Sequence, residues 1–116
     1  MPKKAMLVLT DSMFYILMAL HKTEMCGQEI TDYISLITDG RIVIGPATLY
    51  TILAKFLKEQ LIEETKAEGR KRTYRITDKG EEAYSRELER LRQCILDAEG
   101  SERSERTEEM AAVPVL

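Results

Sequence analysis

Hydroxyl and ammonium side chains share one face of a predicted helix in the middle of the chain. They lie in the segment PATLYTILAKFLKEQLI, residues 46–62, at steps of three and four residues, which places them on one side of a helix. Hydroxyl groups can reach phosphates or base edges and lysines neutralise phosphates, so this face suits contact with a nucleic acid. Taken alone, such a face is more often ordinary solvated surface. Its residues are Thr48, Thr51, Lys55 and Lys58, with Tyr50 on the flank.

A second group of cations lies in a predicted β-hairpin. Residues 61–66 and 72–76 read as two strands around a turn at residues 67–71 that contains a glycine. Clustered positive charge on a hairpin fits a DNA backbone or a minor groove, although a basic turn also serves solubility. The cations are Lys66, Arg70, Lys71, Arg72 and Arg75.

Charge is distributed unevenly along the 116 residues, although the net charge is only −3. Residues 41–79 carry 9 Lys and Arg against 5 Asp and Glu, which is a local excess of positive charge. Residues 1–40 carry 3 against 5, and residues 80–116 carry 5 against 10. A basic middle between two acidic ends indicates one positive surface, built by the segment that holds the helix and the hairpin.

Few side chains could support catalysis or bind a metal ion. His21 is the only histidine, and Cys26 and Cys94 are the only cysteines. They give no credible catalytic triad, metal cluster or disulfide framework, so we expect no enzyme and no cofactor. Each cysteine is expected to be a packed free thiol, and a redox-sensing disulfide between two copies of Cys94 is the less favoured alternative.

Three helices are predicted before the hairpin. Residues 10–12 cap a first helix that ends near Lys22, and a connection at residues 23–26 leads to a second helix that opens at Gly27. Asp39 and Gly40 stop the second helix, and the short β-branched run at residues 41–44 predicts a strand stub. The third helix begins at Pro46 and ends near Gln60. Its expected buried stripe is Leu49, Ile52, Leu53, Phe56 and Leu57.

A fourth helix is predicted after Thr77, which caps it. Its apolar residues recur at steps of four, three and four, a pattern typical of a helix that packs along another helix. The repeat covers only about two heptads, which is short for a coiled coil. Gly100 is expected to end this helix, and residues 100–116 are expected to be disordered because they are charged and lack an apolar stripe. The seam is Tyr84, Leu88, Leu91 and Ile95.

The N-terminus is apolar and begins with two lysines, as a signal peptide can. A polar triplet at residues 10–12 interrupts the apolar run, which stays short of the roughly 18 residues that a membrane span needs. No small-residue cleavage site follows. We therefore expect a cytoplasmic protein without a membrane partner.

The order of these elements predicts an α+β fold that is mainly α. Three helices followed by a β-hairpin form a winged helix-turn-helix, here with a C-terminal dimerisation helix. Residues 1–80 would form the DNA-binding domain, residues 81–99 the dimerisation helix and residues 100–116 the tail. In such a fold the third helix and the hairpin tip face the same duplex.

Two segments resemble the PadR family of winged-helix transcriptional regulators, in its small subclass with a single C-terminal helix. They are PATLYTILAKFLKEQLI (46–62) and GRKRTYRITDKGEEAY (69–84), and the similarity extends from about Ser12 to Leu91. The resemblance implies a homodimeric repressor, or a regulator that a small-molecule effector of unknown identity can release. It also implies that the third helix enters a major groove, that the wing lies on flanking backbone, and that the C-terminal helix pairs with the partner copy.

The sequence departs from the family at two places. The family usually has a His-Gly-Tyr-like segment where this chain has Cys26, Gly27 and Gln28. Multidrug-sensing members of similar length use a tryptophan on the C-terminal helix to bind flat aromatic ligands, and this chain has none, so drug binding is not carried over from those members.

These observations lead to one hypothesis and one alternative. The hypothesis is a homodimeric regulator, expected to be a repressor, that binds an operator in double-stranded DNA. The alternative is a winged-helix module that binds protein instead, through its acidic fourth helix and tail. The expected DNA-binding residues are Thr48, Tyr50, Thr51, Lys55, Lys58, Arg70, Lys71 and Arg72, and the expected dimer interface is Tyr84, Leu88, Leu91 and Ile95.

Overall fold

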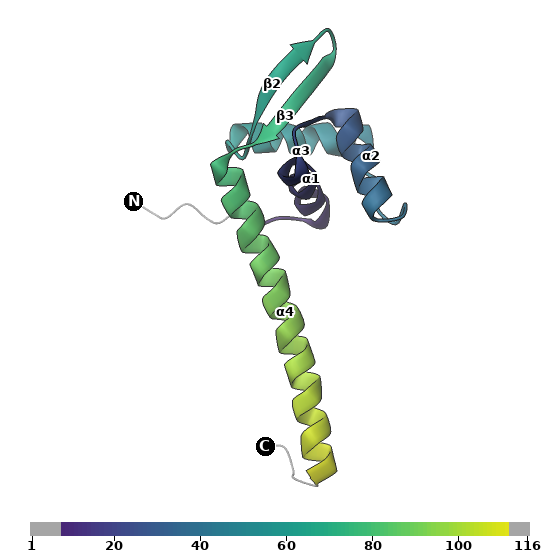
Figure 1. Ribbon diagram of the computed structural model, residues 1–116, viewed down its shortest axis with the longest axis vertical. Coiled ribbons are helices and arrows are strands. Elements are labelled where there is room, and N and C mark those ends of the chain that lie inside the picture. Colours follow the sequence, from purple (N-terminus) through teal and green to yellow (C-terminus); the bar gives the residue numbers. More distant parts are fainter. Residues whose placement is uncertain (1–7, 112–116) are drawn as a thin grey trace, which may run out of the picture. The chain divides into compact units, whose positions relative to one another are not determined.

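The described chain consists of four helices, a β-hairpin, and a short strand between the first two helices. The computed structural model describes residues 8–111, with side chains from residue 8 to residue 102. The elements are α1 (Asp11–Lys22), β1 (Met25–Cys26), α2 (Gly27–Ile37), α3 (Pro46–Lys58), β2 (Ile62–Glu68), β3 (Lys71–Ile76) and α4 (Asp78–Ala111) (Figure 1). The chain divides after Ser85 into two units, which are described separately below. The predicted winged helix-turn-helix, mainly helical, is confirmed.

The first helix is the centre of the apolar core. Thr10 caps α1, because its Oγ1 atom accepts a hydrogen bond from the N–H of Met13 at 3.2 Å. The buried side of α1 is wide, and Ile16 and Leu17 are fully enclosed. Fully buried residues from the other helices complete this core, among them Ile30, Ile34, Leu53 and Phe56. Burial of this apolar surface is the main force that holds the three helices together.

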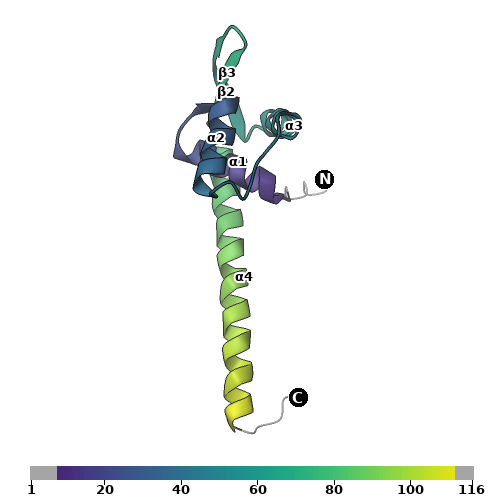
Figure 2. The same ribbon diagram turned by 90° about the vertical axis from the view of Figure 1, so that its right-hand side faces the viewer.

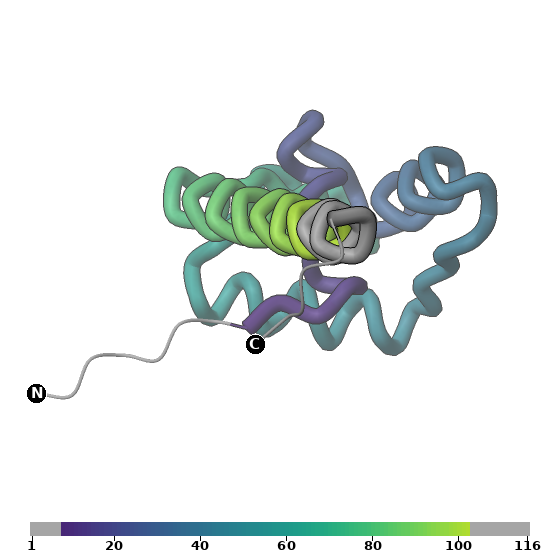
Figure 3. Tube along the Cα trace, turned by 90° about the horizontal axis from the view of Figure 1, so that it is seen from below, coloured from purple at the N-terminus to yellow at the C-terminus, as the bar shows by residue number. Residues whose placement is uncertain are grey.

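The second helix ends where the sequence predicts. Asp39 and Gly40 both have positive φ, at 55° and 74°, and the N–H of Gly40 donates to the carbonyl of Ser35 at 2.7 Å. The buried hydroxyl of Thr38 donates to the carbonyl of Ile34 and accepts from the N–H of Ile42. This side chain therefore fixes the start of the loop that leads to α3. Figure 3 shows the course of this loop from α2 to α3.

The predicted strand stub at residues 41–44 is wrong. These residues form no strand, and Ile44 instead inserts into the core while Val43 stays exposed. The third strand of the sheet is β1, in the segment expected to be a plain connection. Met25 pairs with Tyr74 and Cys26 with Thr73, so β1 occupies the free edge of β3.

The wing is the antiparallel hairpin of β2 and β3, in a sheet of order β1-β3-β2. Figure 2 shows the hairpin extending beyond the helices of the first unit. Gly69, with φ of 61°, allows the tight turn at its tip. A register shift lies between Glu64 and Lys66, so Thr65 is an extra residue that the ladder accommodates as a bulge.

The fourth helix begins inside the first unit. Thr77 caps it as predicted, since its Oγ1 atom accepts from the N–H of Gly80 at 3.1 Å. His21 at the end of α1 contacts Glu81, with 2.6 Å between Nδ1 and Oε1. The ring of Tyr84 stacks on Phe14 with ring centres 5.3 Å apart. The first turns of α4 are thus part of the core.

The described part of the second unit is the remainder of α4, which is helical from Arg86 to Ala111. Arg90 donates to both carboxylate oxygens of Glu87, and this contact lowers the pKa of Glu87. The helix continues through Gly100, so the expected end at that residue is wrong, and residues 100–111 are helical rather than irregular. Residues 112–116 of the expected tail lie outside the described residues. Among the helices described, none combines the length and the apolar composition that crossing a membrane requires.

Candidate nucleic-acid interface

The polar face of α3 is exposed to solvent. Gly45 and Pro46 start the helix, and its apolar stripe turns toward the core. Leu57 was expected in that stripe but is 37% exposed, because it lies about 80° around the helix from Leu49, at the stripe's edge. The residues of the opposite face are all exposed, and the structure gives them no ion pair among the described residues: Thr48, Thr51, Lys55 and Lys58.

The cations of the wing fall into two classes. The Nη1 atom of Arg72 lies 3.0 and 2.9 Å from the two carboxylate oxygens of Glu64. Arg75 is likewise paired with Glu63, and this contact raises the pKa of Arg75. Within residues 8–102 no carboxylate forms an ion pair with Arg70, at the turn. The expected positive footprint of the hairpin is therefore partly neutralised by its own strands.

This neutralisation comes from contacts that the sequence alone does not reveal. In the ladder Glu64 faces Tyr74 and Arg72 faces Ala67, so the paired side chains are diagonal neighbours. Their meeting depends on which residues of β2 and β3 face each other in the hairpin. Sequence reasoning counted the cations of the hairpin correctly but could not assign their partners.

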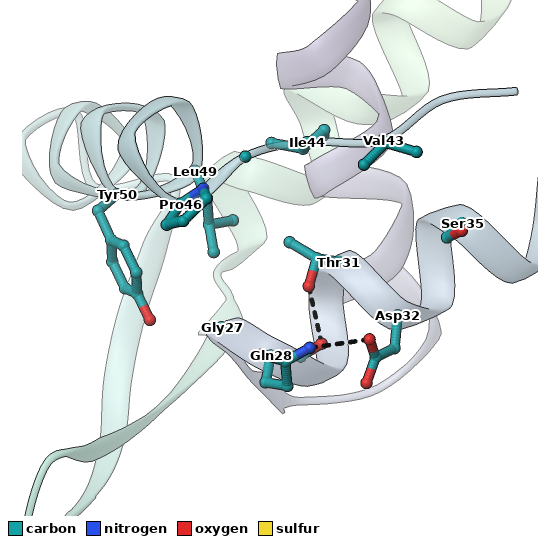
Figure 4. Close-up of a pocket in the computed structure, with 11 residues that line it drawn as sticks. Gly27, Gln28, Thr31, Asp32, Ser35, Val43, Ile44, Pro46, Leu49 and Tyr50 are labelled. Atoms are coloured by element: carbon teal, nitrogen blue, oxygen red, sulfur yellow. Dashed lines mark hydrogen bonds between the residues drawn. The ribbon is translucent and has the colours of Figure 1, made fainter. Parts of the chain in front are cut away.

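Tyr50 links α3 to the start of α2. Its ring leaves the flank of α3 and points toward Gly27, as Figure 4 shows. The Oη atom of Tyr50 lies 2.6 Å from the position that a Cβ atom on Gly27 would occupy. Only a glycine leaves room for the hydroxyl in this position. The segment of Cys26, Gly27 and Gln28 therefore differs from the family pattern at its first and third residues but keeps the glycine.

Polar side chains of α2 face the first turn of α3 across a groove of 440 Å³. Gln28 donates to the carboxylate of Asp32 at 2.9 Å, and the hydroxyl of Thr31 donates to the Gln28 carbonyl at 3.0 Å (Figure 4). Sequence reasoning missed these residues, although their spacing of three and four was a readable signal. The groove is lined by Gly27, Gln28, Thr31, Asp32, Ser35, Val43, Ile44, Gly45, Pro46, Leu49 and Tyr50.

A second hollow, which we name the wing pocket, lies between α3, the start of α2 and the hairpin. It has a volume of 500 Å³. Its carboxylate, on Glu29, accepts the N–H of Cys26 at 2.8 Å, and this bond is the main cause of the lowered pKa of Glu29. Tyr50 lines both the groove and this pocket. The wing pocket is lined by Cys26, Gly27, Gln28, Glu29, Tyr50, Arg70, Lys71 and Arg72.

The predicted dimer seam is not uniform. Tyr84 is buried in its own chain against Phe14, so little of its side chain is left for another molecule. Leu88 and Leu91 are partly exposed, and Ile95 is 57% exposed.

Comparison with known proteins adds relatives of the same architecture. The model of the transcriptional regulator PadR-like family matches residues 16–86. A transcriptional regulator from Clostridium thermocellum is 31% identical, with a TM-score of 0.65 over 74% of this chain and 89% of its own. RosR from H. salinarum is 25% identical, with a TM-score of 0.65 over 90% of this chain and 96% of its own.

A third similar structure contains DNA. Bacillus subtilis PadR in complex with operator DNA is 26% identical, with a TM-score of 0.59 over 66% of this chain and 47% of its own. No curated protein matches the sequence.

Proposed function

This chain belongs to the transcriptional regulator PadR-like family, and we propose that it acts as a homodimeric repressor that binds an operator in duplex DNA. The family is one of transcriptional regulators rather than enzymes. One observation carries the proposal: α3 presents an exposed row of hydroxyls and lysines without ion pairs among the described residues, and the wing beside it carries free cations. The operator complex of the Bacillus subtilis relative supports DNA as the partner.

Each element has a distinct part in this proposal. Thr48 and Thr51 lie near the N-terminus of α3, where a recognition helix meets base edges. Lys55 and Lys58 neutralise phosphates on either side of the groove. The wing, through Arg70, Lys71 and Arg72, holds the flanking backbone, and Arg72 must first leave Glu64.

Two copies would bring two such surfaces to one operator. The part of the seam that stays available in a single chain is Leu88, Leu91 and Ile95, and its burial in a partner would remove apolar surface from water. A two-fold dimer then places two α3 helices in successive major grooves. On the basis of the family resemblance, the proposal also includes release of the protein from DNA by a small effector, and a cytoplasmic location.

A selection experiment tests the DNA proposal without knowledge of the operator. The full chain is mixed with a randomised duplex library, bound duplexes are recovered, and their affinity is measured by fluorescence anisotropy at several salt concentrations. We expect a two-fold symmetric consensus, and a slope of log affinity against log salt of about −0.9 per neutralised phosphate. A chain that enriches no duplex at low salt would instead favour the protein-binding alternative. Repression is tested separately, with a reporter placed behind the selected sequence.

A further inference from the structure

Residues with hydrogen-bond donors from two elements line the wing pocket. The hydroxyl of Tyr50 comes from α3, while the guanidinium of Arg70 and the ammonium of Lys71 come from the hairpin. In the part of the chain that the structure describes, no hydrogen bond occupies these three groups. Within the described residues, the pocket is therefore lined by donors from α3 and from the hairpin that have no hydrogen-bond partner.

The acidic residue of the pocket does not occupy these donors. Glu29 is engaged at the start of α2, where its Oε1 atom accepts the backbone N–H of Cys26. Lys71 is close enough to help lower the pKa of Glu29, but it forms no ion pair with it within residues 8–102. A further acceptor with several oxygens would satisfy donors that the protein leaves open.

The position of Tyr50 is set by its neighbour rather than by chance. With no side chain on Gly27, the phenol ring can lie against the start of α2, and its hydroxyl lies beside Gly27 (Figure 4). Tyr50 and Gly27 both line the wing pocket. Tyr50 is 53% exposed, so it contributes little to the core that would explain its placement. A half-exposed aromatic ring with a free hydroxyl is suited to one polar contact.

We propose that the wing pocket receives one phosphate of the DNA backbone, which Tyr50 from the recognition helix and Arg70 and Lys71 from the wing hold together. This proposal rests on the proposed function and adds a defined site to it. A phosphate offers several acceptor oxygens, and arginine and lysine bind it through charge-assisted hydrogen bonds. Because α3 and the wing hold the same phosphate, their contacts fix the register of α3 in the major groove.

The source of the phosphate is the duplex, because the pocket lies between the two elements that the proposed function places on DNA. A free phosphate ion has the same chemistry, and a thermal-shift titration with inorganic phosphate alone examines it. The proposal would be overturned if inorganic phosphate stabilised the chain while no phosphate of the duplex was found whose contact depends on Tyr50 and Arg70.

A phosphate scan locates the contact. In the duplex selected by the wild-type chain, each phosphate is replaced in turn by an uncharged methylphosphonate, and the loss of affinity is measured. We expect one position in each half-site whose replacement weakens the wild-type chain by about tenfold or more. At that same position, replacement should cost Tyr50→Phe and Arg70→Gln less than about threefold, because each variant has already lost part of this contact.

A double-mutant cycle provides a second readout. Tyr50→Phe and Arg70→Gln each lower the affinity about three- to thirtyfold, and the double variant loses at least about threefold less than their product. The matched control pairs Tyr50→Phe with Lys58→Gln, since Lys58 is about 12 Å farther along α3 and does not line the pocket. That cycle should be additive within about twofold.

The outcomes separate the proposal from the function on which it rests. If the wild-type chain selects a duplex but Tyr50 and Arg70 affect different phosphates, or their cycle is additive, the shared phosphate is refuted and the regulator remains. If no duplex is selected, both fail. Thermal melting of each variant, with a midpoint near that of the wild type, excludes unfolding as the cause of a loss.

Discussion

The hydroxyl oxygen of Tyr50 stands 2.6 Å from the point where a side chain on Gly27 would begin. These two residues belong to different helices of the helix-turn-helix, and their contact makes the orientation of a surface tyrosine depend on a glycine in α2. The atom in the way is the far end of a side chain, so a larger residue at position 27 should move the tyrosine rather than unfold the domain. The contact can therefore be tested by function.

Gly27→Ala should weaken DNA binding while the fold is preserved. The new Cβ atom would displace the Tyr50 hydroxyl, and the loss of one hydrogen bond lowers affinity by about three- to tenfold. The obstructing hydroxyl is the end of a side chain that is 53% exposed, so Tyr50 can move aside without opening the core. Anisotropy with the selected duplex measures the affinity, and thermal melting measures the stability.

The matched control for this change is Tyr50→Phe. Without the hydroxyl, the nearest atom of the ring is Cζ, at 3.2 Å from the added Cβ position. In that background Gly27→Ala should change the affinity by less than about twofold. An equal loss in both backgrounds would show that the alanine acts by another route.

Gly80→Ala should strongly destabilise the first unit. A Cβ atom at this position would stand 2.1 Å from the carbonyl oxygen of Leu61 and 2.7 Å from a side-chain carbon of Ile76. Because the first of these is a backbone atom, the start of α4 must move, at a cost of about 2–3 kcal/mol. Urea unfolding followed by circular dichroism measures the change.

Gly100→Ala is the internal control for the same substitution. Gly100 also lies in α4, but nothing stands within 4 Å of its added Cβ atom. Here alanine should stabilise the helix by about 0.5–1 kcal/mol. If both variants behaved alike, crowding at Gly80 would not be the cause.

The wing cations should differ in their contribution to the salt dependence. Arg70→Gln should reduce the slope by about 0.9 for each protomer bound, and Lys55→Gln should do the same on α3. Arg72→Gln should reduce the slope by less, because Arg72 must exchange Glu64 for a phosphate. Glu64→Gln, which frees Arg72, should tighten binding and steepen the slope. Anisotropy at several salt concentrations decides this, and equal effects of Arg70 and Arg72 would contradict the exchange.

Ile95→Glu should prevent formation of the proposed dimer and abolish tight operator binding. The substitution places a charge on the exposed part of the seam, where two copies would bury it without a partner. Sedimentation equilibrium at micromolar concentration measures the mass. Glu89→Gln, at a side chain that is 75% exposed, controls for a change of charge on the same helix. A dimer that survives both Ile95→Glu and Leu91→Glu would exclude the seam as the interface.

Acid should weaken the start of α2 through Glu29. The backbone bond from Cys26 lowers the pKa of Glu29 below its ordinary value of 4.5. Because the folded-state pKa is the lower one, the carboxylate stabilises the fold above pH 4.5, and this contribution is lost as the pH falls through the folded-state pKa. The difference in melting temperature between the wild type and Glu29→Gln should be positive at neutral pH and shrink below pH 4.5. Glu82→Gln, at an exposed position of α4, controls for net charge, and a pH-independent difference would refute the role of the carboxylate.

Local signals were sufficient to predict most of the fold. The hydroxyl of Thr10, the Asp39 and Gly40 pair, and the hydroxyl of Thr77 each act within five residues of their own position, so helix starts and stops could be read directly. The end at Gly100 was predicted wrongly, because one glycine costs a helix only about 1 kcal/mol and its neighbours favour helix. The strand β1 was missed because two residues carry no periodicity.

Contacts between residues that are distant in the sequence could not be predicted from it. Tyr84 has the spacing of a dimer seam, yet its ring stacks on Phe14, seventy positions earlier, inside its own chain. Charge counting found the cations of the wing but not the bond between Arg72 and Glu64, which requires the register of the hairpin. The exposed face of α3, in contrast, follows from helical spacing alone and agrees with the structure.

The bulge in β2 decides where this hairpin can change its length. Thr65 is the extra residue, since Glu64 and Lys66 face two neighbouring residues of β3. A chain without Thr65 would keep the same pairs from Lys66 to the tip, now in a regular ladder. A residue gained or lost in the turn at residues 69–70 would instead re-pair the tip. In evolutionary terms, a one-codon insertion or deletion is expected to be tolerated at position 65, whereas the same change in the turn would give the regulator a different wing.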